Sequence, residues 1–153
     1  MKDEIALRVP LDRRATIRKA CEKGEVETVR KMLDESPELL TPALWPPTIH
    51  VGRSLAVSQL LLDRGLDPNQ SSAPRKPLHL ASGRGLSDLV RLLLSRGATI
   101  DVIDGENFTP YELMCSGLAS APNKEEIRQI LRDAGAKDTI FTHLMLGQED
   151  EAL

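Results

Sequence analysis

The sequence predicts an all-α fold, a solenoid in which helix-turn-helix units repeat along the chain. Three observations lead to this prediction. Apolar residues with helical spacing recur at a fixed period. Glycine ends several of these segments, as expected of helices that close in the left-handed conformation. Aromatic residues make up only 3% of the 153 residues, so the core must be built from leucine, isoleucine, valine and alanine.

The clearest unit covers residues 77–102, which read PLHLASGRGLSDLVRLLLSRGATIDV. Pro77 is expected in the first turn of a helix, where its missing N–H would have no partner anyway. Gly83 and Gly85 break this helix. A second apolar segment follows and is expected to end at Gly97. The unit is therefore predicted to be two helices joined by a tight turn.

Parts of this unit recur along the chain. Thr109–Leu113 repeats Lys76–Leu80 after about 33 residues. The segments 20–33, 60–67 and 127–136 repeat its helix endings. The whole chain is therefore predicted to be one array of related units.

This pattern resembles the ankyrin repeat family, whose repeats begin T-P-L-H-x-A and have a period of about 33 residues. The resemblance implies an ankyrin repeat solenoid of helix-turn-helix units with β-turn fingers. The expected organisation is an N-terminal extension at 1–12, four repeats at about 13–40, 41–70, 71–103 and 104–137, and a C-terminal tail at 138–153. The third repeat carries the family residues Pro77, Leu78, His79, Ala81, Gly85, Val90, Leu93, Leu94, Gly97 and Ala98.

The other repeats depart from the pattern. In repeat two, Pro46-Pro47 precedes a short first helix, and we expect an irregular loop around Trp45. Repeat four carries an insertion, SGLASAPNK, which is expected to form a loop with a potential functional role. The tail residues 139–146 are expected to form a short helix that covers repeat four, and residues 147–153 to be solvated and mobile. The basic residues of the first helix are expected to form a solvated cap: Arg13, Arg14, Arg18 and Lys19.

His79 is the residue that most resembles a catalytic group. The family resemblance implies a structural role instead, in which its ring hydrogen-bonds neighbouring turns, with His50 in the same role in repeat two and His143 exposed. The resemblance implies structural roles also for Pro77, Gly85, Gly97 and Pro110.

No nucleophile motif of the G-x-S-x-G type and no Walker motif occurs. Asp101, Asp104 and Glu106 lack the spacing of a calcium loop and are expected in a solvated finger. Cys21 and Cys115 show no disulfide or zinc spacing and are expected as small core residues. We therefore expect no catalytic residue, no cofactor and no metal.

One weaker resemblance concerns the segment 61–69. It loosely resembles the stretch that asparaginyl hydroxylase modifies in ankyrin repeats, although Pro68 replaces the usual apolar residue. The favoured interpretation of Asn69 is a turn residue.

The resemblance implies a function in protein–protein interaction, through a concave groove formed by the fingers and the first helices. Phe108, Arg75 and Arg84 are expected at the centre of the partner site, because aromatic residues and arginine are enriched at interfaces. The alternative for Phe108 is local packing on the finger or on the insertion. Trp45 is a second candidate, for which packing under its loop is the favoured alternative. The residues carried over from the family groove are Ser72, Ala73, Arg75, Arg84, Arg96, Gly105, Glu106, Phe108 and Ser116.

The charges of this groove are mixed. Arg75, Lys76, Arg84 and Arg96 are expected to cluster near one end, so a partner with an acidic segment is expected, with the charges mainly steering its approach. The net charge of −3 gives no reason to expect nucleic acid or an anionic membrane as a partner. No apolar run suggests a secretory signal or a membrane span, so cytosol or nucleus is the expected compartment.

Two other classes of function stay open. A regulatory inhibitor that occludes another protein's active surface would have the same sequence features, and so would a module cut from a larger protein. An enzyme has little support, because it would need a pocket with convergent titratable groups. A monomer is expected, and the partner is not identified by the sequence.

Overall fold

The computed structural model describes residues 10–50, 55–116, 118–119 and 121–150, except for the side chains of residues 46, 47, 50 and 148–150. These residues form helices and connecting turns and contain no strand, so the predicted all-α class is confirmed. The chain divides into two compact units, an N-terminal unit of residues 1–73 and a C-terminal unit of residues 74–153. Each unit is described by itself.

The N-terminal unit contains two helical hairpins. The first consists of α2 (Leu11–Lys23) and α3 (Val26–Glu35), and the second of α4 (Trp45–His50) and α5 (Leu55–Asp63). The 3-10 helices η1 (Pro37–Leu39) and η2 (Pro42–Leu44) connect them. Helix α2 packs on α4, and α3 packs on α5. The buried apolar residues of this unit are Ile17, Ala20, Cys21, Val29, Met32, Leu33, Leu39, Leu44, Trp45, Ile49, Val57, Leu60, Leu61, Leu62 and Leu66.

The prediction of an irregular loop around Trp45 is wrong, because Trp45 begins helix α4. Pro46 and Pro47 follow in the first turn, where a missing N–H removes no intrahelical hydrogen bond. The Trp45 side chain is fully buried, and its Nε1 donates a hydrogen bond to the Asp67 carbonyl oxygen at 3.0 Å. The largest side chain of the chain is therefore a core residue of this unit.

The basic residues of α2 differ in their surroundings. The helix begins at Leu11, two residues before the expected start of repeat one. Arg13 lies 2.6 Å from the Glu35 carboxylate and 3.0 Å from the Ser36 hydroxyl, so it ties the start of α2 to the end of α3. Arg18 and Lys19 are exposed.

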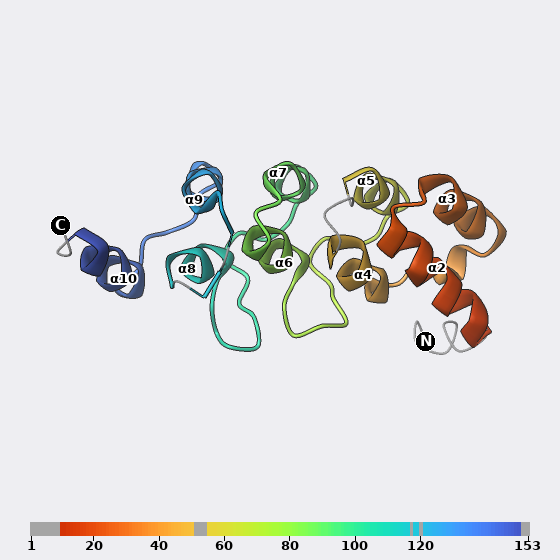
Figure 1. The fold of residues 1–153 in the computed structure, drawn as a ribbon, viewed down its shortest axis with the longest axis horizontal. Helices are drawn as coiled ribbons and strands as arrows, with labels where there is room; N and C mark the ends of the chain where they lie inside the picture. The colour runs from red at the N-terminus through yellow and green to blue at the C-terminus, as the bar shows by residue number, and fades with distance from the viewer. Residues whose placement is uncertain (1–9, 51–54, 117, 120, 151–153) are drawn as a thin grey trace. The chain divides into compact units, whose positions relative to one another are not determined.

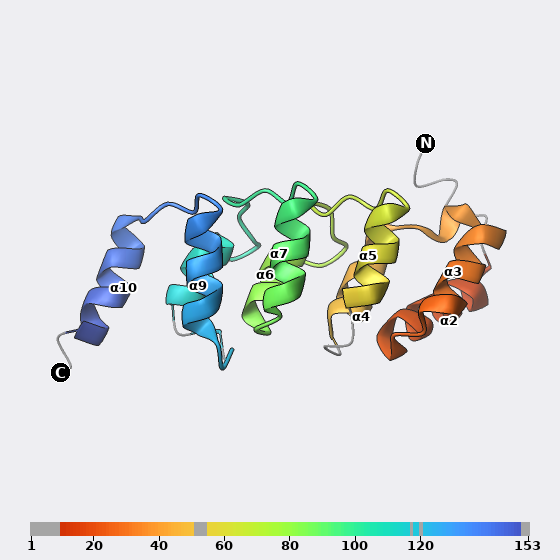
Figure 2. The ribbon, with the colours of Figure 1, turned by 90° about the horizontal axis from the view of Figure 1, so that it is seen from above.

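The C-terminal unit contains two helical hairpins and one further helix. The hairpins are α6 (Pro77–Gly83) with α7 (Ser87–Ser95) and α8 (Pro110–Cys115) with α9 (Lys124–Asp133), and α10 (Ile140–Asp150) follows. Within this unit, Figures 1 and 2 show α6, α8 and α10 in one layer and α7 and α9 in a second layer. Its buried apolar residues are Leu78, Ala81, Leu89, Val90, Leu93, Tyr111, Leu113, Met114, Cys115, Ala119, Ala121, Ile127, Ile130 and Leu131.

The turn between α6 and α7 depends on Gly85, whose φ is +71°. A Cβ added there would also collide with the side chain of Asn123 from the repeat-four insertion. The Asn123 Nδ2 donates to the Gly85 carbonyl oxygen at 3.0 Å and to the Ser87 hydroxyl at 2.8 Å. The insertion therefore packs onto the preceding helical hairpin.

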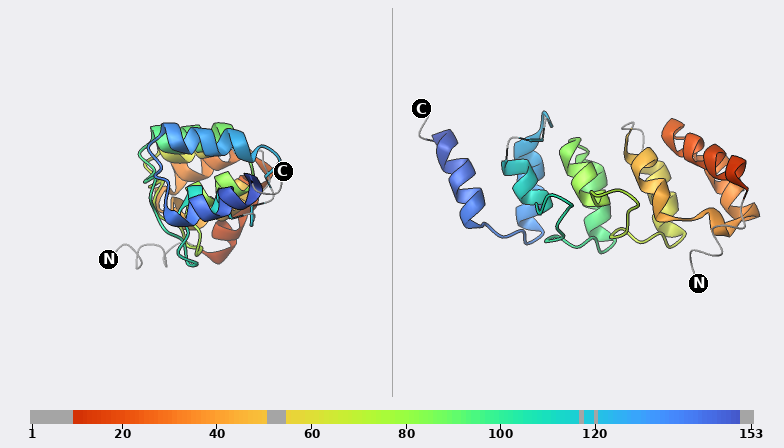
Figure 3. Two further views of the ribbon diagram at one scale, coloured as in Figure 1. Left: turned by 90° about the vertical axis from the view of Figure 1, so that its left-hand side faces the viewer. Right: turned by 90° about the horizontal axis from the view of Figure 1, so that it is seen from below.

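Helix α10 occupies the segment in which a tail helix was expected. It continues to Asp150, four residues beyond the expected end at Leu146. Residues 151–153 lie outside the described residues. Helix α10 packs on α8 and so extends the layer that α6 and α8 form (Figure 3).

Candidate functional site

The finger between α7 and α8 is built around the carboxylate of Asp104. One carboxylate oxygen accepts hydrogen bonds from the backbone N–H groups of Glu106 (2.9 Å) and Phe108 (3.0 Å). The backbone N–H of Asp104 donates to the Phe108 carbonyl oxygen at 3.0 Å. Asn107 closes the turn with a φ of 64°. The expectation that Asp104 is solvated is therefore wrong, because its side chain is buried as the hydrogen-bond acceptor of the finger.

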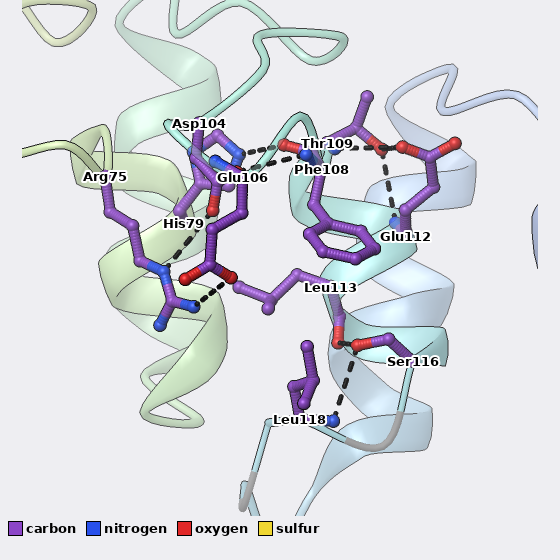
Figure 4. Close-up of polar contacts among 10 residues, drawn as sticks. All are labelled: Arg75, His79, Asp104, Glu106, Phe108, Thr109, Glu112, Leu113, Ser116 and Leu118. Carbon is purple, nitrogen blue, oxygen red and sulfur yellow. Dashed lines mark hydrogen bonds and ion pairs between the residues drawn. The ribbon is translucent and has the colours of Figure 1, made fainter.

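Arg75 completes this network at the surface (Figure 4). Its Nε lies 3.3 Å from the Asp104 carboxylate, and its terminal nitrogen lies 3.5 Å from the Glu106 carboxylate. Burial by itself would raise the pKa of Asp104. The backbone N–H groups of Phe108 and Glu106, together with the charge of Arg75, outweigh burial and lower this pKa. Asp104 is therefore an ionised residue at neutral pH, while Glu106 stays exposed.

His79 joins helix α6 to the same finger. Its ring is buried, and its Nε2 lies 2.7 Å from the carbonyl oxygen of Phe108. A carbonyl oxygen can only accept, so Nε2 carries the hydrogen. Burial lowers the pKa of His79, although the Phe108 carbonyl and Asp104 act in the opposite direction. This neutral ring holds two elements together, and its Nδ1 has no hydrogen-bond partner in the described part of the chain.

Phe108 is half-buried, and its ring packs against Phe141 of α10. The ring centroids are 5.5 Å apart, and the ring planes are inclined by 54°. The alternative expected for Phe108 was local packing on the finger or on the insertion. Its ring packs on α10 instead. The ring therefore contributes both to the surface and to the docking of α10.

Helix α8 begins with a capping box that fixes the residue after Phe108. The Thr109 hydroxyl accepts from the Glu112 N–H at 3.2 Å, and the Glu112 carboxylate accepts from the Thr109 N–H at 3.0 Å. Pro110 occupies the first helical position. The second oxygen of Glu112 accepts from the Thr139 hydroxyl at 3.0 Å. The finger, α8 and the start of α10 therefore form one connected network.

The loop after α8 adds an exposed leucine. The Ser116 hydroxyl donates to the Leu113 carbonyl oxygen at 2.9 Å and accepts from the Leu118 N–H at 3.4 Å. Leu118 is 61% exposed. Figure 4 shows this loop together with the finger. We use the term finger surface for the set Arg75, Glu106, Phe108, Ser116 and Leu118.

The finger surface does not include the other residues expected at the partner site. Ser72 and Ala73 belong to the N-terminal unit. Arg84 stands at the end of α6, about 12 Å along the helix from Lys76, so it does not join the expected basic cluster. Arg96 is exposed at the end of α7. The exposed Gly105 lies beside Pro74.

The prediction of Trp45 as a partner-binding residue is wrong. Its side chain has no exposed area and uses its only polar atom inside the N-terminal unit, so a partner has no access to it. The side chain of His50 lies outside the described residues. His143 is exposed, as expected. The Asn69 N–H donates to the Asp67 carboxylate at 2.8 Å, an arrangement typical of a turn.

Both cysteines are buried, free thiols, as expected of core residues. Burial raises the pKa of Cys21 to about 11, and burial also raises the pKa of Cys115. Within the described ranges, no group of three histidine, cysteine, aspartate or glutamate residues could hold a metal ion. Among the helices of the same ranges, none combines the length and apolar character needed to cross a membrane.

Comparison with known proteins identifies the array. The ankyrin repeat family model matches residues 75–105, which include α6, α7 and most of the finger. Cyclin-dependent kinase 4 inhibitor B of Rattus norvegicus is 30% identical over 99 residues, which cover 61% of this chain and 76% of that protein. The chain belongs to the ankyrin repeat family. Ankyrin repeats generally mediate protein–protein interaction, and proteins of this family are generally non-enzymatic binding or regulatory proteins.

Two other relatives are much longer proteins. Ankyrin repeat and SOCS box protein 16 of Mus musculus is 35% identical over 85 residues, covering 54% of this chain and 19% of that protein. ARF GTPase-activating protein Git of Drosophila melanogaster is 34% identical over 103 residues, covering 65% of this chain and 13% of that protein. The chain therefore spans about a fifth or less of the length of these two relatives.

Sequence reasoning missed four residues that shape the site of this ankyrin repeat protein: Asp104 as a buried acceptor, Asn123, Leu118 and Phe141. A signal existed for Asp104, because an aspartate just before a Gly-x-Asn turn often accepts backbone N–H groups. Asn123 stands directly before helix α9, which made it a candidate helix cap. Nothing in the sequence indicated that Phe141 would contact Phe108, since they belong to different elements.

Proposed function

We propose that this chain is a non-catalytic protein-binding module that holds a partner protein on its finger surface and along the first helices α6 and α8. One observation carries the proposal. The finger carries the half-buried ring of Phe108, and the loop after α8 carries the exposed Leu118. The ion pair between Glu106 of the finger and Arg75 accompanies them. Apolar residues and arginine at the centre of a polar rim are typical of protein interfaces.

The backbone beneath these side chains supports the proposal. Asp104 fixes the finger, His79 ties the finger to α6, and the capping box at Thr109 fixes the start of α8. Side chains on such a backbone lose little conformational entropy when a partner binds. We expect the partner to insert an apolar side chain beside Phe108 and to present polar groups to Arg75 and Glu106.

Charge supports an acidic segment in the partner. Lys76 lies next to Arg75 in the chain at the start of α6, and Arg96 lies at the end of α7. Because α6 and α7 form a hairpin, the start of α6 and the end of α7 lie at the same end of it, and so do these three basic residues. Charges at a protein surface act mainly on the rate of association, and their effect weakens with salt.

The proposal is tested by affinity capture from a native lysate, followed by binding measurements with the captured protein. Phe108→Ala and Leu118→Ala are expected to weaken binding about tenfold or more, as central interface residues do. Phe141→Ala is the matched control for Phe108, because it removes the same ring contact from the side of α10. Arg75→Ala is also expected to weaken binding, and Arg91→Ala is its control, because Arg91 is an ion-paired arginine on α7.

The controls decide the interpretation. Equal losses for Phe108→Ala and Phe141→Ala would mean that Phe108 acts only by docking α10. Full binding by every variant would place the partner elsewhere on the chain. If the intact chain captures no protein under conditions in which it is helical by circular dichroism, the assignment as a binding module fails.

A regulatory inhibitor is the second candidate, and one comparison favours it. The relative that shares the largest part of its length with this chain among those described above is named an inhibitor of cyclin-dependent kinase 4. An inhibitor would occlude an active surface with the same finger surface that an adaptor uses for binding. Assaying the captured partner's activity with and without this chain separates the two functions, because only an inhibitor lowers that activity.

A further inference from the structure

Helix α10 docks on the C-terminal unit with little buried apolar surface. Among the side chains of residues 140–147, only that of Thr142 is buried. In α8, by contrast, every residue except Glu112 is buried. The burial of apolar surface supplies most of the free energy that holds packed helices together. The docking of α10 therefore depends on a small number of contacts near its start.

Two of these contacts join the start of α10 to the finger and to α8. The Phe141 ring packs on the ring of Phe108, with the centroids 5.5 Å apart. The Thr139 hydroxyl donates to the Glu112 carboxylate at 3.0 Å. A hydrogen bond that water can replace adds little net free energy. The ring pair is therefore the principal apolar contact between α10 and the finger.

The connection from α9 to α10, residues 134–139, has the character of a hinge. Gly135 has a φ of 101°. The Asp138 carboxylate accepts from the Tyr111 hydroxyl at 3.0 Å and lies 3.8 Å from the Arg132 guanidinium. The side chains of this ion pair are both more than 40% exposed, and exposed ion pairs contribute little to stability. The connection therefore allows α10 to leave α8 while the two hairpins stay folded.

The contact with α10 covers the residue on which the proposed function depends. Phe108 is half-buried, and the Phe141 ring packs against it. A partner that packs on the covered part of the Phe108 ring must first displace α10. We propose that α10 is a displaceable occupant of this place, and that the partner replaces it with a helix of its own. The proposal rests on the proposed function, which places the partner at Phe108.

The start of α10 shows which chemistry the partner's helix needs. The Thr139 hydroxyl binds Glu112 and also accepts from the Thr142 N–H at 3.3 Å, at the start of the helix. Two residues after Thr139, the Phe141 ring packs on Phe108. The partner's helix therefore begins with a serine or threonine that binds Glu112, and it carries an aromatic residue two positions later. While α10 is docked, the apparent affinity for such a helix is reduced by the fraction of chains in which the place is open.

The first test uses a fluorescein-labelled peptide of residues 138–150, whose binding is followed by fluorescence polarisation. We expect it to bind the Phe141→Ala chain at least about tenfold more tightly than the intact chain, whose own α10 competes at a high effective concentration. A peptide that itself carries Phe141→Ala is expected to lose this binding. The His143→Ala chain is the matched control. Because His143 is exposed on α10, this chain should bind the peptide as weakly as the intact chain.

The second test uses the protein obtained by affinity capture with the intact chain. We expect it to displace the labelled peptide from the Phe141→Ala chain. We also expect it to bind the Phe141→Ala chain at least about threefold more tightly than the intact chain, because the competing helix is weakened. Circular dichroism verifies that both chains are equally helical.

Hydrogen exchange of the unmodified chain measures the displacement without any variant. Hydrogen-bonded amides of α10 are expected to exchange at least about tenfold faster than those of α9, because a segment that opens locally exchanges faster than the hairpins that stay folded. Equal protection of α9 and α10 would show that α10 does not open by itself, and the proposal would then be wrong.

The other outcomes separate this proposal from the proposed function. Equal binding of the peptide to the intact and Phe141→Ala chains overturns the displacement. So does a captured protein that leaves the peptide bound, or one that binds the Phe141→Ala chain no more tightly than the intact chain. In these cases the proposed function stands if Phe108→Ala still weakens binding of the captured protein. If the intact chain captures no protein, the proposed function fails, and the displacement by a partner fails with it.

Discussion

At the scale of single residues, His79 links stability to pH. The neutral ring is buried and donates to the Phe108 carbonyl, and burial holds its pKa below the ordinary value of about 6.5. The unfolded chain therefore binds a proton at a higher pH than the folded chain. The contribution of His79 is fully present above about pH 7 and is lost as the pH falls through about 6.5 and below.

We expect the free energy of unfolding, measured by urea denaturation, to fall between pH 7.5 and 5.5. In His79→Gln the decline should be shallower, because a glutamine amide can still donate to the Phe108 carbonyl and does not titrate. His143→Gln is the control, since His143 is exposed and should leave the decline unchanged. An identical decline in His79→Gln and the intact chain would contradict this account.

A second prediction at this scale concerns the stability lost when Gly85 or Gly97 is replaced by alanine. Both have positive φ, 71° and 87°, but a Cβ at Gly97 would meet open space, whereas a Cβ at Gly85 would collide with Asn123. We expect Gly97→Ala to cost about 1–2 kcal/mol of unfolding free energy from backbone strain alone. Gly85→Ala should cost more in the same denaturation experiment. Equal costs would mean that Asn123 moves aside freely.

At the scale of elements, the capping box of α8 is expected to contribute measurably to the stability of the chain. Thr109→Ala removes the acceptor of the Glu112 N–H, and we expect a cost of about 1 kcal/mol in unfolding free energy. Thr109→Ser keeps the hydroxyl and should retain most of the stability. Chemical denaturation of the three proteins measures both effects. If alanine and serine behave alike, the hydroxyl contributes nothing to the start of this helix.

The sequence predicted the helices of the C-terminal unit well because their signals are local. Pro77 and Pro110 mark helix starts, and Gly97 marks a helix end, each through its own backbone preference. The start of helix α4 was placed too late, after the proline pair, because two prolines suggest a loop although the first turn of a helix tolerates them. The burial of Trp45 then depends on Asp67, 22 positions away, which no local pattern reports.

The candidate site was predictable to a smaller degree. The family resemblance named Arg75, Glu106, Phe108 and Ser116 as candidates, and these positions remain a proposal. The turn of the finger determines where the backbone of Phe108 lies. The packing of its ring depends on α10, which comes later in the chain. Phe108 contacts Phe141 only after α10 has docked, and no local pattern in the sequence pairs these two residues.

At the scale of the whole molecule, the two units offer separate probes of unfolding. Trp45 is the only tryptophan and is buried in the N-terminal unit, so its fluorescence reports on that unit, whereas circular dichroism reports on all helices. Leu113→Ala should cost about 2–5 kcal/mol, because Leu113 is buried in the C-terminal unit. We expect it to shift the circular dichroism transition more than the fluorescence transition, as repeat arrays allow. Coincident shifts would show that the chain unfolds as one cooperative body.

The contact between Asn123 and the turn at Gly85 limits how freely these repeats can be exchanged. Exchanging repeat four for an idealised repeat of standard length would delete the insertion. The Gly85 carbonyl and the Ser87 hydroxyl would then both lose a hydrogen-bond donor. Repeats three and four are therefore matched parts, and a chimaera that keeps one of them should keep both.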